Sequence, residues 1–521
     1  METIQRLKMK KKACLFFMIL SSVLIFAFGN EAAETKKDYP LCDMYLGSKI
    51  PYPGPGKAEL TPIPEGYEAN FIYWVNRHGS RNLSSFKYDK AWLELLVFAE
   101  SEGQLTKKGK VLLKEIQKIV EHEKGRYGLL TGLGKNELYK IGKRTGDLYK
   151  NLFGSNKPLL AEATYKERTW ESRDNFLKGL KESGYKGEIT FTRSEKNTDP
   201  YLRPFDIAAK YKKYKKAGKW YQKIDAFAKI NNAEVAARRI VSPFFKPEFS
   251  DKLNKGGLEF KSEKNEVVIN NLVSAAYSLW EIYTILPALK EDGLSGIDMK
   301  KYFTKADLRF FEDYQNAKAY YTKGPGDAGK DSIALSIMAP LAKNMIHEVD
   351  TYLKGESAYL GIFDFCHAET VVPLVGFFEI GKSADSAEEI SEAVKYWDAG
   401  YYGPMAANLE WIIYTAEGKE PLVKMLLNER EIPFAAAIKP VNAFYYKWSD
   451  VKTYYAEKAA KPVCFAFRAC SIGAKAISLA SAAGTPFLPL SNSPAGKSAF
   501  QAFTLKTVRC LRAASHKWNV F

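Results

Sequence analysis

Five consecutive apolar residues, Phe71 to Val75, constrain the fold of this chain more than any other feature. They are aromatic or β-branched and lack the polar alternation of a half-exposed strand, so they predict a strand buried on both faces. Residues 359–366 have the same character, and further strand candidates lie at residues 409–415 and 422–427. Because helical patterns separate these strands, we predict an α/β fold with a mostly parallel sheet flanked by helices.

The region between the first two strands divides the predicted core. Residues 206–349 are rich in Lys and aromatic residues and follow a helical pattern, which indicates an inserted α-helical domain. We therefore expect the α/β core to consist of residues 30–205 and 350–457. With 521 residues, 46% of them hydrophobic, the chain has ample material for such a core, which excludes wholesale disorder.

Residues 1–29 have the pattern of a secretory signal peptide. Five basic residues and one Glu precede a 16-residue apolar run, Ala13 to Phe28. This run is shorter than the roughly 20 residues that a membrane-spanning helix needs. The sequence therefore predicts a cleaved signal and a secreted or periplasmic protein. We expect no stable membrane span after cleavage.

The net charge of +17 is concentrated at the ends of the chain. Residues 1–29 carry +4 and residues 458–521 carry +9, which leaves +4 for the rest, so nucleic acid is not an expected partner. The last 64 residues contain no Asp or Glu, although the chain has 60 acidic residues. We interpret residues 458–521 as an atypical tail outside the fold, and hypothesise that it is translated from a wrong reading frame.

Chemically versatile side chains follow both buried strands. The sequence Arg-His-Gly-Ser-Arg at residues 77–81 follows the first strand, and His367 and Glu369 follow the second. Ligands of parallel sheets bind at the carboxyl ends of strands, and Arg side chains match phosphate oxygens. A guanidinium beside an imidazole keeps it neutral and nucleophilic. One His after a strand is usually structural, but two such strand ends predict an anion site.

These two motifs are similar to the signatures of a known family. Residues 77–81 resemble the signature of the histidine acid phosphatases, and His367-Ala368-Glu369-Thr370 resembles the second signature of one branch, the multiple inositol polyphosphate phosphatases. The resemblance covers roughly residues 40–457. It includes the stretches 131–134, 168–180, 202–206, 404–408, 427–430 and 447–450. It implies a phosphoglycerate-mutase-like α/β fold with a helical insert.

The resemblance also implies a role for each matching residue. His78 would be the nucleophile and Glu369 the proton donor for hydrolysis of inositol polyphosphates such as phytate, with no metal or other cofactor. Arg77, Arg81, Arg168 and His367 would hold the transferring phosphoryl group. The substrate-binding candidates are Lys87, Arg203, Lys212, Lys213, Lys215 and Lys216. Residues 82–85 (Asn-Leu-Ser-Ser) depart from the Pro and Thr that many members have there. This departure affects the substrate-pocket contacts beside the nucleophile and leaves the nucleophile and anion site intact.

Alternatives remain at several positions. The Lys-rich, aromatic segment 210–223 suits a solvated helix face, a single-strand nucleic-acid site or, in keeping with the resemblance, a cationic lid over a polyanion. Residues 324–331 nearly match a phosphate-binding loop, but Asp331 stands where a hydroxyl is needed, so we predict a turn. Cys42 and Cys366 fit two buried thiols better than a disulfide.

Two other functions fit the same sequence. The chain could be a less selective acid phosphatase acting on sugar phosphates or bisphosphoglycerate. It could also be a non-catalytic extracytoplasmic protein that binds phosphoesters. The presence of all six side chains that the resemblance assigns to catalysis favours an enzyme.

Overall fold

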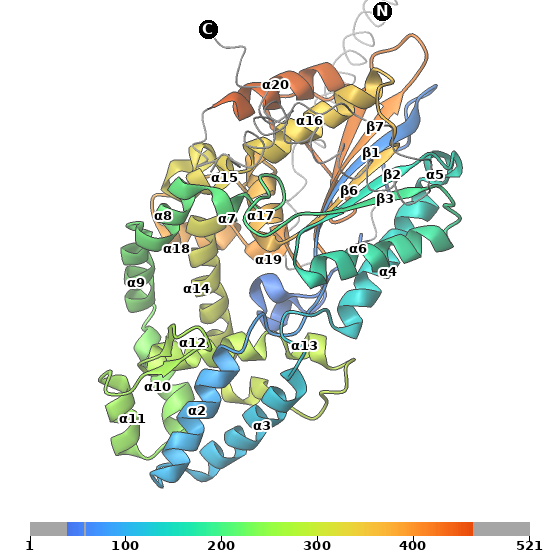
Figure 1. The fold of residues 1–521 in the computed structure, drawn as a ribbon. Helices are drawn as coiled ribbons and strands as arrows, with labels where there is room; N and C mark the ends of the chain where they lie inside the picture. The colour runs from blue at the N-terminus through green and yellow to red at the C-terminus, as the bar shows by residue number, and fades with distance from the viewer. Residues whose placement is uncertain (1–38, 57–58, 462–521) are drawn as a thin grey trace, which may run out of the picture. The chain divides into compact units, whose positions relative to one another are not determined.

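The computed structural model describes residues 39–56 and 59–461. The predicted signal peptide and the tail beyond Lys461 lie outside this part of the chain. A central sheet has the strand order β10-β8-β7-β1-β6-β2-β3, with β9 paired to β8. Strands β7, β1, β6, β2 and β3 are labelled in Figure 1. The strands are β1 (Glu68–Arg77), β2 (Leu159–Ala163), β3 (Ile189–Arg193), β6 (Gly361–Cys366), β7 (Asn408–Thr415), β8 (Leu422–Leu427), β9 (Arg430–Ile432) and β10 (Tyr446–Lys447).

The predicted α/β class is confirmed, and the sheet has two halves of different direction. Strands β1, β6, β2 and β3 are parallel, whereas β7 runs antiparallel to β1 and is followed by antiparallel β8, β9 and β10. The strands predicted at residues 409–415 and 422–427 are present as β7 and β8. Their antiparallel pairing was not predicted, because side-chain patterns report burial and not strand direction.

Helices cover both faces of the sheet, which explains the unbroken apolar run in β1. Phe71, Tyr73 and Val75 pack on one face in the same core as residues of α16 (Ala339–Leu353), α17 (Ala368–Phe377) and α20 (Trp448–Ala460). Ile72 and Trp74 pack on the other face with residues of α4 (Gly132–Leu148) and α6 (Glu167–Glu182) (Figure 1). Residues 458–460, the first of the predicted tail, complete α20, and Ala459 is buried.

A second apolar core lies among the helices drawn below the sheet in Figure 1. It combines residues of α2 (Tyr88–Ser101) and α3 (Lys107–Glu123) with residues of α10 to α14, so helices before the predicted insert also contribute. The limits of the insert at residues 206 and 349 stay a prediction. The other helices are α5 (Lys150–Gly154), α7 (Pro204–Ile207), α8 (Ala209–Ala217), α9 (Trp220–Ile230), α10 (Ala233–Val241), α11 (Pro247–Asn254), α12 (Leu272–Tyr283), α13 (Leu286–Leu289), α14 (Lys305–Lys323), α15 (Ile333–Ser336), α18 (Ile390–Tyr396) and α19 (Ala399–Tyr402).

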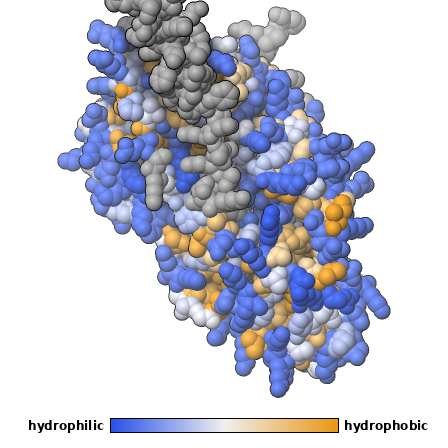
Figure 2. Space-filling view, turned by 180° about the vertical axis from the view of Figure 1, so that it is seen from behind, coloured by the Kyte–Doolittle hydropathy of each residue, from blue (hydrophilic) through white to orange (hydrophobic). Residues whose placement is uncertain are grey.

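One described segment is long and apolar enough to cross a membrane, although the sequence pattern predicted none. Leu272–Leu289, which includes α12 and α13, has 18 residues, and 78% of this window is buried inside the fold. Its apolar side chains contribute to the second core. On the molecular face in Figure 2, coloured residues are mostly hydrophilic with apolar ones scattered among them.

The start of α4 packs directly against the loop that follows β1. The Thr131 side chain caps this helix, and its backbone N–H donates to the carbonyl oxygen of Ser80. A Cβ atom on Gly134 would lie 2.0 Å from that same oxygen, which is far inside van der Waals contact. Glycine at 134 therefore permits the close approach of helix and loop.

We expect Gly134→Ala to destabilise the protein by about 1–3 kcal/mol, because the added methyl forces α4 away from the loop. Urea unfolding measures this change, and Gly154→Ala is the matched control, since a Cβ there meets nothing within 4 Å. Equal stability of the two variants would contradict the packing argument.

Candidate active site

The register of β1 and β6 brings the two predicted histidines together. Arg77 pairs with Cys366 in this parallel ladder, so the next residues, His78 and His367, leave the sheet side by side. Their ring centroids are 5.5 Å apart, and both side chains are buried. The two signatures, almost 300 residues apart in sequence, therefore form one site at the carboxyl ends of the strands.

The hydrogen bonding of His78 defines which nitrogen is reactive. Its Nδ1 lies 3.0 Å from the carbonyl oxygen of Gly79. Because a carbonyl oxygen only accepts, Nδ1 carries the proton and the lone pair is on Nε2. Burial, followed by the charges of Arg168, Arg77 and Arg81, holds the pKa of His78 well below its usual range. His78 is thus a neutral imidazole with a nucleophilic Nε2 in mild acid.

Three guanidinium groups surround this imidazole with donors to spare. The Nε atoms of Arg77, Arg81 and Arg168 are buried and have no hydrogen-bond acceptor among the described residues. Burial, together with repulsion from Arg81, lowers the pKa of Arg77 to about 10 and that of Arg168 to about 9, so both stay charged near neutrality. Unsatisfied, buried cationic donors are the expected lining of a site for a compact oxyanion.

Carbonyl and carboxylate oxygens hold the loop at residues 77–81 in place. The Nη1 of Arg77 donates to the carbonyl oxygens of Ser48 and Gly403, each at 2.5 Å. The Glu137 carboxylate accepts hydrogen bonds from the backbone N–H and hydroxyl of Ser80, at 2.7 and 2.8 Å. The loop is therefore fixed by contacts that leave the inner donors of the guanidinium groups available.

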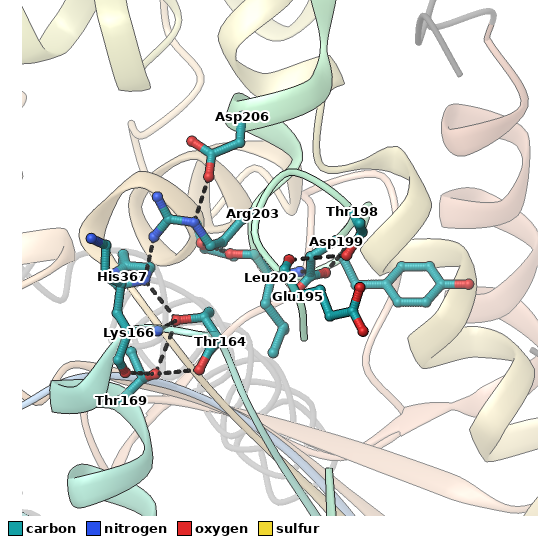
Figure 3. Close-up of polar contacts among 12 residues, drawn as sticks. Thr164, Lys166, Thr169, Glu195, Thr198, Asp199, Leu202, Arg203, Asp206 and His367 are labelled. Carbon is teal, nitrogen blue, oxygen red and sulfur yellow. Dashed lines mark hydrogen bonds and ion pairs between the residues drawn. The ribbon is translucent and has the colours of Figure 1, made fainter. Parts of the chain in front are cut away.

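Arg203 lies closer to the centre than its place among the substrate-binding candidates implied. Its Nη1 is 2.6 Å from His367 Nε2, while its Nε donates to Asp206 at 2.6 Å (Figure 3). The guanidinium lies over the rings of Tyr165 and Phe205, with centroid distances of 4.9 and 4.7 Å. Arg203 is thereby held rigidly against the second histidine.

Both nitrogens of His367 face donors. Arg168 Nη2 is 3.3 Å from Nδ1. Nε2 is near both Arg203 and the Thr164 hydroxyl (Figure 3). A neutral imidazole has one acceptor nitrogen, so it cannot accept from both guanidinium groups at once. Burial, followed by Arg168 and Arg203, keeps the pKa of His367 well below its usual range. Arg168 and Arg203 therefore compete for one acceptor nitrogen, and a bound oxyanion would accept hydrogen bonds from the guanidinium group that His367 cannot satisfy.

Glu369 lies in the first turn of α17, where the helix dipole favours a negative charge. Its Oε1 is 3.1 Å from Lys323 Nζ at the end of α14. Burial alone would raise the pKa of Glu369, but the ammonium groups of Lys323 and Lys215 oppose it, and the pKa of Glu369 lies well below its usual range. Glu369 is therefore ionised in the resting protein.

The lysine candidates do not all approach the site. Lys215 on α8 interacts electrostatically with Glu369, whereas Lys212 donates to the Asp206 carbonyl at 3.2 Å. All four lysine candidates of α8, Lys213 and Lys216 included, are exposed. Lys87 pairs with Glu266 at 3.2 Å. Lys323 could not be predicted from the sequence, because it is one of several lysines in a long helix and has no motif around it.

Three of the four aromatic residues of segment 210–223 pack into the fold, and only Tyr221 among the four is exposed. Tyr211 and Trp220 are buried, and the Tyr211 and Tyr214 hydroxyls donate to the carbonyls of Thr322 and Tyr321 in α14. These contacts argue against the single-strand nucleic-acid alternative, since base stacking needs exposed rings.

Two further sequence expectations have structural outcomes. Residues 324–331 follow α14 and include a short 3-10 helix, Gly326–Asp331, so the phosphate-loop alternative lacks its strand and the predicted turn is present. Cys366 is buried in β6 and forms no disulfide with Cys42.

The departure at residues 82–85 is structural at its first two positions. Asn82 and Leu83 are buried, and the Asn82 side chain donates to the Leu129 carbonyl at 3.1 Å.

Among the described residues, no three His, Cys, Asp or Glu side chains are grouped as metal ligands. The donor set around His78 is cationic and suits an anion.

Comparison with known proteins agrees with this geometry. The sequence profile of the histidine phosphatase superfamily (branch 2) matches residues 70–428. This chain belongs to the histidine phosphatase superfamily. The matched region contains both signatures, His78 and His367 included.

Similar proteins bear the name that the second signature suggested. The chain is 23% identical over 333 residues to multiple inositol polyphosphate phosphatase 1 of Gallus gallus. This match covers 62% of this chain and 67% of the chicken protein. It superposes on Bifidobacterium longum multiple inositol polyphosphate phosphatase in complex with inositol hexasulfate with a TM-score of 0.72 and 24% identity, covering 80% and 98% of the two chains. The phytase of D. castellii superposes on this chain with a TM-score of 0.60 and 14% sequence identity, and the match covers 83% of this chain and 89% of the phytase. The predicted resemblance is thus confirmed.

A buried carboxyl group, that of Glu123, binds the loop that follows residues 77–81. Both oxygens of Glu123 accept from the backbone N–H of Leu83, at 3.1 and 3.2 Å. Burial raises the pKa of Glu123 to about 7, although the Leu83 hydrogen bond acts in the opposite direction. The folded protein therefore binds this proton more tightly than the unfolded chain, and the group costs stability as pH rises from about 4.5 to 7.

We expect Glu123→Gln to gain about 2 kcal/mol of stability relative to the wild type between pH 5 and pH 8, because the amide has no charge to desolvate. Urea unfolding at the two pH values measures this difference. The exposed Glu121→Gln on the same helix is the control. A pH-independent effect of Glu123→Gln would contradict the raised pKa.

Proposed function

We propose that this protein hydrolyses phosphomonoesters of inositol polyphosphates, phytate included, through a phosphohistidine at His78. The observation that carries the proposal is a neutral His78, with its lone pair on Nε2, among buried guanidinium donors that lack acceptors. The names of the chicken and B. longum relatives support the substrate class. Export of the protein stays a prediction from residues 1–29.

In the first step, His78 Nε2 attacks phosphorus while the ester P–O bond breaks. Arg77, Arg81 and Arg168 neutralise charge on the equatorial oxygens, with His367 held alongside by Arg203. Glu369, once protonated, gives its proton to the leaving alkoxide oxygen, which would otherwise depart as a costly anion. The products are the alcohol and N-phosphorylated His78.

In the second step, water attacks the phosphohistidine. Glu369, now a carboxylate, takes a proton from this water as the new P–O bond forms and the N–P bond breaks. Phosphate leaves, and His78 returns to its neutral form. One carboxyl group thus serves as acid and then as base, and each step is a displacement at the same phosphorus.

Lysines around the catalytic pocket favour a substrate with more than one phosphate. Burial, and after it repulsion from neighbouring lysines, lowers the pKa of Lys318 on α14 and of Lys215 on α8. Lys323 at the end of α14 is among these neighbours of both. A single phosphoryl group occupies the Arg donors and leaves these ammonium groups without a phosphate. Neighbouring phosphates of an inositol ring would bind them.

We expect His78→Ala to reduce phosphate release from phytate by at least about a thousandfold, because no nucleophile remains. Glu369→Gln should accumulate an acid-labile, alkali-stable phosphoenzyme with p-nitrophenyl phosphate, since this leaving group needs no proton but the second step needs the base. Chromatography of inositol phosphates and alkaline gels of labelled enzyme measure these outcomes, with His347→Ala as the control. Unchanged turnover in His78→Ala would favour the non-catalytic alternative.

We expect Lys215→Gln to raise the KM for phytate several-fold more than the KM for glucose 6-phosphate, because only phytate has a further phosphate for this ammonium. Steady-state kinetics at fixed ionic strength measure both constants. Lys213→Gln on the same helix is the matched control, since Lys213 is exposed and resembles Lys215 in everything but its approach to Glu369. Wild-type preference for the sugar phosphate would favour the less selective phosphatase.

A further inference from the structure

The resting site holds its proposed proton donor in the wrong form for the first step. Glu369 forms an ion pair with Lys323, and an ionised carboxylate cannot protonate a leaving group. Within the described site, the charged groups that act on Glu369 are cations: Lys323 on α14 at 3.1 Å, Lys215 on α8, and the guanidinium groups of Arg77, Arg81 and Arg168. Something must remove this cationic influence before Glu369 can act as an acid.

We propose that Lys323 is a specificity-determining residue that holds the Glu369 carboxylate until a second phosphate group of the substrate binds the Lys323 ammonium and frees Glu369 to take up a proton. The proposal rests on the proposed function, because it assigns Glu369 the donor role. It makes proton donation by Glu369 depend on a second phosphate of the substrate. The relatives' names give an inositol polyphosphate, but neither the names nor the signatures assign such a dependence.

The backbone around Lys323 is fixed, while its side chain can reach two partners. Lys323 is the last residue of α14, and the Tyr211 hydroxyl of α8 donates to the carbonyl of its neighbour Thr322 at 2.7 Å. The next residue, Gly324, is tightly packed, because a Cβ atom there would lie 2.6 Å from the Trp397 ring. The Lys323 side chain is 17% exposed, so part of it faces solvent, from which a phosphate of the substrate would approach.

Electrostatics favour this exchange when a polyanion binds. A phosphate carries up to two negative charges and competes with a single carboxylate for the ammonium, and the charge of the substrate also opposes ionisation of Glu369. Once Lys323 has moved, burial raises the pKa of Glu369 with less opposition. Glu369 then takes a proton from solvent water and delivers it to the ester oxygen as the His78–phosphorus bond forms and the P–O bond breaks.

A monophosphate cannot trigger this sequence. Its one phosphoryl group binds the Arg donors beside His78, and no second phosphate reaches Lys323. Glu369 stays paired and ionised, so an alkyl monophosphate is cleaved slowly even though it occupies the site. Lys323 therefore acts on selectivity through the protonation of Glu369 as well as through binding.

The test compares Lys323→Met with Lys323→Arg, which keeps the charge, and with Lys305→Met at the exposed start of the same helix. The substrates are phytate, glycerol 2-phosphate and p-nitrophenyl phosphate. We expect Lys323→Met to raise kcat for glycerol 2-phosphate about tenfold near pH 6, because loss of the ammonium raises the pKa of Glu369 and with it the protonated fraction. It should shift the alkaline limb of that pH profile upward and lower kcat/KM for phytate. The other two variants should resemble the wild type.

The outcomes separate this proposal from its alternatives. A fall in turnover of glycerol 2-phosphate and phytate by the same factor in Lys323→Met, with an unchanged pH profile, would show that Lys323 only binds anions and would overturn the proposal. If wild-type enzyme releases no phosphate from phytate, the proposed function fails, but the rise with glycerol 2-phosphate still tests the Lys323–Glu369 pair. Turnover of p-nitrophenyl phosphate shows that each variant is folded, and Lys323→Gln replaces the Met variant if it lacks this turnover.

Discussion

The parallel pairing of β1 with β6 is the constraint on which the site depends. Its register places Arg77 opposite Cys366, so the chain leaves both strands at one edge with His78 and His367 in contact. A shift of one residue would turn the side chains of one strand to the opposite face and separate the two imidazoles. Helices on both faces hold that register, because alternate residues of β1 contribute to two different cores.

The site concentrates positive charge, and the surrounding protein is organised to tolerate this. Burial and, after it, the neighbouring guanidinium groups lower the pKa of both histidines, which keeps the imidazoles neutral. The carboxylates nearest the loop bind backbone N–H groups instead of the cations. Glu137 and Glu123 thereby fix the loop without occupying the donors that an oxyanion needs. Glu369 is different, because it pairs with a lysine from the helical part of the chain and so couples the catalytic edge to α14.

Much of the fold and of the candidate site was accessible from the sequence. The unbroken apolar run of β1 requires two covered faces, and the strands at β6, β7 and β8 were predicted for similar reasons. The signatures identified His78, His367 and Glu369. The antiparallel half of the sheet was not accessible, since strand direction depends on pairing partners. The place of Arg203 against His367 and of Lys323 against Glu369 was missed, because both contacts join elements more than 40 residues apart and neither has a local pattern.

The sequence by itself determined which side chains can do the chemistry: a histidine flanked by arginines after a buried strand, and a second histidine followed by a glutamate. Residue type and strand periodicity are local properties, so they can be recognised without a structure. Only the tertiary structure decided which nitrogen of His78 is free, which arginine contacts His367 and which lysine controls Glu369. Protonation depends on burial and on charges brought together across the fold, and these are set by packing between distant segments.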